Sequence, residues 1–62
     1  MKEVIVFNDV EAAREVALAL GLSAENDYSW PVPAVRILGE VSSVRGFIVY
    51  LAAVSETAVI VE

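Results

Sequence analysis

The sequence predicts a single α+β domain in which one helix packs on one face of a small, mainly antiparallel sheet, in the order β-α-β-β-β. Three observations lead to this prediction. The chain has 62 residues, which is enough for one domain spanning residues 1–62. One segment carries apolar residues at helical spacing, and four others are runs of β-forming residues. The short connections between the last three runs are typical of antiparallel neighbours.

The first strand and the helix are predicted from the N-terminal third of the chain. The run at 4–7 is continuously apolar and rich in β-formers, which indicates a strand covered on both faces. Asn8 and Glu11 have the spacing of a capping box. We therefore expect a helix over Asp9–Leu20, with Gly21 as its stop. Its predicted buried stripe comprises Val10, Ala13, Val16, Ala17 and Leu20.

Leu18 lies among charged residues on the opposite face of the predicted helix. A singly exposed leucine is common on protein surfaces and needs no special explanation. The alternative is that this face of the helix contacts a partner. On that second interpretation, Leu18 is a candidate interface residue.

Residues 22–33 form the longest break between predicted elements. Two prolines in it impose extended geometry on Trp30 and Val32. Because tryptophan is enriched at the centres of protein interfaces, we identify Tyr28, Trp30 and Pro31 as candidate ligand- or partner-binding residues. The alternative is that Trp30 closes one end of the small core.

Three strands are expected over 34–41, 47–54 and 57–61, with Gly46 in the first turn and Ser55–Glu56 in the second. Both faces of the middle strand are apolar, whereas a strand with one face open to water alternates. One helix covers only one face of a sheet, so the other face or an edge strand needs a partner. The candidate interface residues are Ile48, Tyr50 and Val54, with Phe47, Val49 and Leu51 on the alternative face.

Composition also predicts self-association. With glycine counted and tyrosine left out, apolar residues make up about 60% of the chain, above the roughly 45–50% typical of globular domains on the same count. At this size, apolar burial and the loss of conformational entropy nearly cancel. The chain has no cysteine and no histidine, so neither a disulfide nor a zinc site is available to stabilise it. We therefore expect a homodimer or a larger homo-oligomer.

Charge and hydropathy argue against two classes of partner. The net charge is −5, and only four residues are Lys or Arg, so nucleic-acid binding is not expected. The longest uncharged apolar run, 47–54, is far shorter than the roughly 20 residues of a membrane-spanning helix, and the N-terminus does not resemble a signal peptide. We expect a soluble, cytoplasmic protein with no membrane partner, for which a basic surface of another protein is a further candidate partner.

The residues offer little for catalysis. With no histidine or cysteine, we predict no catalytic residue, no metal site and no cofactor. The leading hypothesis is a non-enzymatic protein-interaction module, such as a small regulator or inhibitor. The alternative is a small-ligand, flavin-like binding protein with a site between subunits near Trp30. A third possibility, an enzyme using carboxylates alone, would rely on Glu25 and Asp27.

Overall fold

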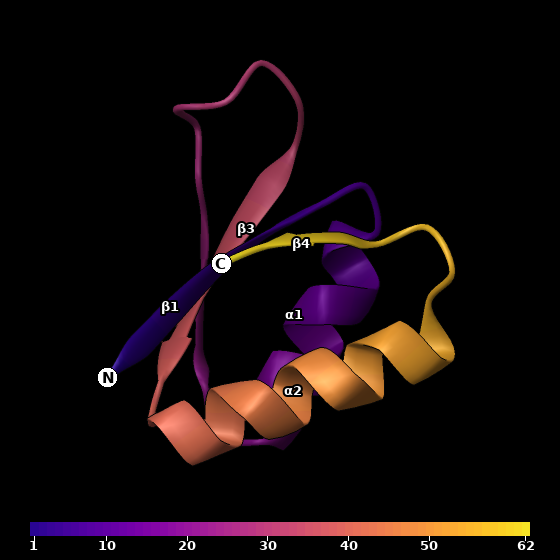
Figure 1. The fold of residues 1–62 in the computed structure, drawn as a ribbon. Coiled ribbons are helices and arrows are strands. Elements are labelled where there is room, and N and C mark those ends of the chain that lie inside the picture. The colour runs from indigo at the N-terminus through magenta and orange to yellow at the C-terminus, as the bar shows by residue number, and fades with distance from the viewer.

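The computed structural model describes all residues 1–62. Four strands form one sheet, and two helices pack on the same side of it (Figure 1). Neither helix is long and apolar enough to cross a membrane. The elements in chain order are β1 (Lys2–Phe7), α1 (Val10–Ala19), β2 (Ser23–Asn26), β3 (Ala34–Gly39), α2 (Val41–Val54) and β4 (Val59–Val61).

The sheet has the strand order β2-β3-β1-β4, and every neighbouring pair is antiparallel. Strands β1 and β2 therefore run parallel, with β3 inserted between them, and β3 and β4 are separated by β1 in the same way. Two such split β-α-β units make the ferredoxin-like topology. The predicted α+β class, with an antiparallel sheet and helical packing on one face, is confirmed.

The core lies between the sheet and the helices. Val4 and Val6 of β1 pair in register with Ile37 and Val35 of β3, and all four are at most 1% exposed. Side chains alternate between the two faces of a strand, so these four point to the same side. The helices cover that side and complete the core with Ala13, Ala17, Val44, Phe47 and Leu51.

Helix α1 lies within a residue of its predicted bounds. Gly21 follows its end with φ 73°, the left-handed conformation expected of a glycine stop. The predicted capping box is wrong, because Asp9 is the N-cap and makes no side-chain cap bond. Asn8 has φ 73°, and its amide donates a hydrogen bond to the Thr57 carbonyl.

Residues 42–46 and 47–54, predicted as a turn and a strand, belong to helix α2 instead. The one-helix β-α-β-β-β order is therefore wrong at this element. Its β-branched and aromatic residues favour a strand locally, but Val44, Phe47 and Leu51 recur at helical spacing and are 0% exposed. Packing of this stripe against the sheet outweighs local propensity.

Strand β2 was not predicted, since it lies inside the expected break at 22–33. It is a four-residue edge strand with mostly exposed side chains, so it lacks the apolar run that marks the other strands. Backbone pairing with β3 holds it in place. The extra strand and the extra helix together turn the predicted single-helix layer into a symmetric pair of β-α-β units.

Ser55 connects the end of α2 to the start of α1. Its hydroxyl donates a 2.6 Å hydrogen bond to Asp9 Oδ2 and accepts one from the Ala58 backbone N–H. Ser55 is only 7% exposed. Its hydrogen bond to Asp9 therefore holds the C-terminal end of α2 against the N-terminal end of α1. The chain then enters β4, which is an edge strand of the sheet.

Glycine substitutions test whether 41–54 is helical. Gly46 lies within α2, and a Cβ added there meets no atom within 4 Å. We expect Gly46→Ala to raise the free energy of unfolding by about 0.5–1 kcal/mol, because alanine loses less backbone entropy in a helix. The matched change Gly21→Ala should lower it by about 1–2 kcal/mol, since φ at this position is left-handed. Urea unfolding measures both, and a destabilised Gly46→Ala would contradict the helical assignment.

Candidate functional site

Asp27 organises the loop that joins β2 to β3. Its Oδ1 accepts hydrogen bonds from the Ser29 backbone N–H at 3.0 Å and the Ser29 hydroxyl at 2.6 Å, and its Oδ2 accepts one from the Trp30 indole at 3.0 Å. The Asp27 backbone N–H donates to the Ala34 carbonyl across the base of the loop. The sequence Asp-Tyr-Ser-Trp thus forms a turn built on one carboxylate.

These donors change the acidity of the carboxyl group. The Ser29 hydroxyl and the Ser29 backbone N–H hold the pKa of Asp27 below its ordinary value of 3.8. Loss of hydration raises that pKa, while the Trp30 indole and the positive charge of Arg36 lower it further. Asp27 is therefore ionised near neutral pH, and its carboxylate accepts hydrogen bonds from Ser29 and Trp30 within the loop.

Trp30 packs on the sheet rather than lying free in the loop. Its ring meets the Phe7 ring edge-on, with centroids 5.0 Å apart and an interplanar angle of 83°, the geometry that aromatic quadrupoles favour. Trp30 nevertheless stays 42% exposed. Tyr28 and Pro31 are exposed on the same loop, and Tyr28 accepts a hydrogen bond from the Asn26 amide. The three predicted binding residues are thus near one another, and whether they bind anything stays a prediction.

A cavity of about 380 Å³ adjoins this loop. Arg14 of α1 donates a hydrogen bond to the Asn26 side chain, which ties one wall of the cavity to the helix. Most of its lining residues are apolar, and they come from the start of α1 and from both ends of the loop. They are Val10, Asn26, Asp27, Tyr28, Trp30, Val32, Pro33 and Ala34.

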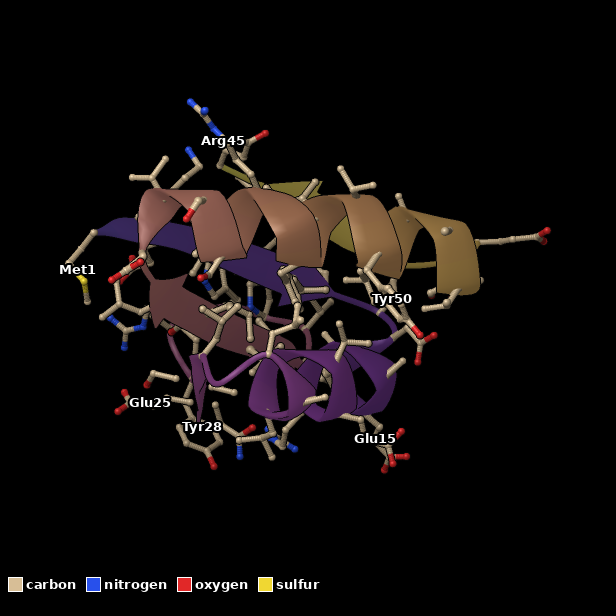
Figure 2. The ribbon with its side chains drawn as sticks, turned by 90° about the horizontal axis from the view of Figure 1, so that it is seen from below. Met1, Glu15, Glu25, Tyr28, Arg45 and Tyr50 are labelled. Carbon is tan, nitrogen blue, oxygen red and sulfur yellow. The ribbon has the colours of Figure 1, made fainter.

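The predicted interface residues all lie on the helical layer. Leu18, Tyr50 and Val54 are 62%, 57% and 55% exposed, and Figure 2 shows Tyr50 between the two helices. Ile48 is only partly exposed and packs against the core. The argument that placed Ile48, Tyr50 and Val54 on a free sheet face is wrong, because this segment is helical. Their role as interface residues stays a prediction.

The face of the sheet away from the helices, here called the open sheet face, has no covering layer. Its side chains alternate with buried Val4 and Val6 in β1 and with their counterparts in the other strands. Val59 and Val61 in β4 are 47% and 43% exposed. A water-facing sheet surface normally carries polar residues, yet the apolar members here are Ile5, Phe7, Leu38, Val59, Val61 and the buried Ala34.

Arg36 lies on the open sheet face between two carboxylates. It pairs in register with Glu25 of β2 and Ile5 of β1, and its guanidinium is 3.9 Å from Glu3. Both partners of this ion pair are more than 40% exposed, so the pair contributes little to stability. The Arg36 Nε is buried and has no hydrogen-bond partner in the chain. The arginine therefore has unused donor capacity.

The sequence predicts an uncovered sheet face but not the residues that form it. The signal was present in residues 2–7, where Glu3, Ile5 and Phe7 alternate with the two core valines. It was obscured because the apolar run at 4–7 was interpreted as a strand covered on both faces. No group of three acidic side chains forms a cluster that could hold a metal ion.

Acid titration tests the role of Asp27. Because its folded-state pKa lies below 3.8, its stabilisation of the loop is complete at pH values above the ordinary pKa and is lost as the pH falls through the folded-state pKa. We expect the indole N–H resonance of Trp30, the only tryptophan, to shift in that acidic range. Asp27→Asn should abolish this shift. An unchanged titration in Asp27→Asn would show that another group controls the loop.

The chain has no significant match among known family models, curated proteins or solved structures. The strand order alone defines its topology, and one topology of this kind supports many unrelated functions. The function must therefore be argued from the surfaces themselves.

Proposed function

We propose that this chain is a non-enzymatic protein-interaction module that associates with itself. One observation carries the proposal. Twelve large apolar side chains stay exposed after folding, as many as there are buried residues. Apolar surface on this scale marks interaction sites when it is contiguous. A module of 62 residues gains most from a partner that covers such surface, because its own core is small.

The charge distribution supports a protein partner. Lys2 pairs with Glu62 at 3.1 Å, Arg36 is engaged with Glu3, and Arg14 bonds to Asn26. Arg45 is the one remaining basic side chain, and it extends from the outer side of α2 (Figure 2). The surface is thus mostly acidic, which suits solubility in the cytoplasm and also a basic surface of another protein as a further partner.

A second candidate function is the binding of a small, flavin-like molecule near Trp30. The cavity beside the loop has about 380 Å³, within the range of roughly 300–1,000 Å³ typical of ligand sites. Its tryptophan and tyrosine offer ring faces for stacking. Riboflavin bound there should quench Trp30 fluorescence. If neither riboflavin nor FMN changes that fluorescence, the ligand-binding alternative fails.

Sedimentation equilibrium tests self-association. Between about 1 and 100 µM, we expect the average mass to rise above the 6.7 kDa of one chain toward a dimer or a larger assembly. The driving force is apolar burial, so the association should strengthen in sulfate, which favours such burial. A mass of one chain throughout this range would contradict the proposed function.

A further inference from the structure

We propose that a second copy of this chain covers the open sheet face, with the same face of each copy meeting across a two-fold axis. This inference rests on the proposed function and specifies its interface. A two-fold contact uses one patch on both partners, so the patch must be complementary to itself in shape and in charge. The open sheet face meets the charge condition and offers apolar residues to bury, as its residues show.

The apolar part of the face is continuous across three strands. Ile5 of β1 pairs in register with Val61 of β4, and Phe7 pairs with Val59. Trp30 extends this apolar surface at one end through its contact with Phe7. Ala34 of β3 lies opposite Phe7. Directly opposite side chains on one sheet face lie about 5 Å apart, so these residues form a connected surface over β4, β1 and β3. Leu38 lies apart from it, because it is opposite Glu3 and Ser23 and is separated from Ala34 by Arg36.

The charged part of the face carries both signs. Arg36 is flanked by Glu25 and Glu3, so one cation lies between two anions. When this arrangement meets a copy of itself, the carboxylates of one subunit can approach the guanidinium of the other. Arg36 has donors for this at the exposed end of its guanidinium, because its side chain is 42% exposed and its only ion pair, to Glu3, is 3.9 Å long.

The helical layer is a poorer surface for self-association. The groove between the helices, of about 300 Å³, is lined by Val16, Leu20 and Tyr50 but also by Glu15. Glu11 is exposed on the same helix one turn earlier. No basic residue lines this groove, so a symmetric contact through it would bring two Glu15 carboxylates together with no cation such as Arg36 to offset them.

The size of the open sheet face sets the strength of the contact. Strands of six, four, six and three residues, about 4.8 Å apart and rising about 3.4 Å per residue, give a flat area of roughly 300 Å² per copy. Both copies together therefore cover on the order of 600 Å², and side-chain relief raises the accessible area buried. This lies below the roughly 1,200 Å² of a standard specific interface and in the range of weak, transient contacts. We expect a dissociation constant in the micromolar range.

Matched valine-to-lysine substitutions test the interface. Val61 lies on the open sheet face and Val49 on the outer side of α2, and both are exposed, at 43% and 72%. Val61→Lys should weaken the dimer at least about 100-fold, because it places an unpaired charge in the contact. Val49→Lys should dissociate like the wild type. Sedimentation velocity over a dilution series measures the dissociation constants of the wild type and of both variants.

The outcomes separate the two proposals. A wild-type chain that is monomeric at all concentrations overturns the proposed function and this inference together. A wild-type dimer that Val49→Lys weakens as much as Val61→Lys, or that neither variant weakens, overturns the sheet-face interface and leaves self-association standing. Lysine is well tolerated on edge strands, and a circular dichroism spectrum confirms that Val61→Lys is folded.

A second measurement avoids substitution altogether. On dilution of the wild-type dimer, the methyl resonances of Val59 and Val61 should shift as the interface opens, and those of Val49 should stay constant. Movement of the Val49 methyls with constant Val59 and Val61 methyls would place the contact on the helical layer and overturn the inference.

Discussion

The packing of the sheet against two helices on a single side is the interaction on which the rest of the structure depends. Val4 and Val6 lie in the two central strands together with Val35 and Ile37, and all four are almost completely buried beneath the helices. Side chains alternate between the two faces of a strand. Because these four residues point toward the helices, Ile5 and Leu38 point to the opposite face of the sheet. No helix covers that side, and the loop residue Trp30 packs on it only at Phe7.

This arrangement places the core and the open sheet face on opposite sides of the same strands. The core side is closed by Phe47 and Leu51 of α2, at 0% exposure, and by the Ser55–Asp9 hydrogen bond between the helix ends. The open side has one loose ion pair and an arginine donor without an acceptor. The aromatic loop borders the open side, because Trp30 reaches Phe7 and Asp27 holds Trp30 in place.

Much of the fold could be predicted from the sequence, and the errors have physical causes. Helix α1 and strands β1, β3 and β4 were expected close to their observed positions, because their apolar periodicity agrees with their packing. Helix α2 was missed since its β-branched and aromatic residues favour a strand locally, whereas Val44, Phe47 and Leu51 pack as a helical stripe. Strand β2 was missed because an exposed edge strand has no apolar pattern.

For the site, the loop at Trp30 could be predicted from residue types, but the open sheet face required the register of strands distant in sequence. The expectation that one sheet face lacks a cover remains valid, with different residues forming that face.

The central claim is that a second copy of the chain covers the open sheet face. An isotope-filtered nuclear Overhauser experiment on an equimolar mixture of ¹³C-labelled and unlabelled chains tests it most directly, because only contacts between copies give a signal. The account predicts intermolecular signals from the methyl groups of Ile5, Leu38 and Val61, and none from those of Val49. Intermolecular signals confined to Val49 and Leu18, or none in a sample shown to be dimeric, would contradict it.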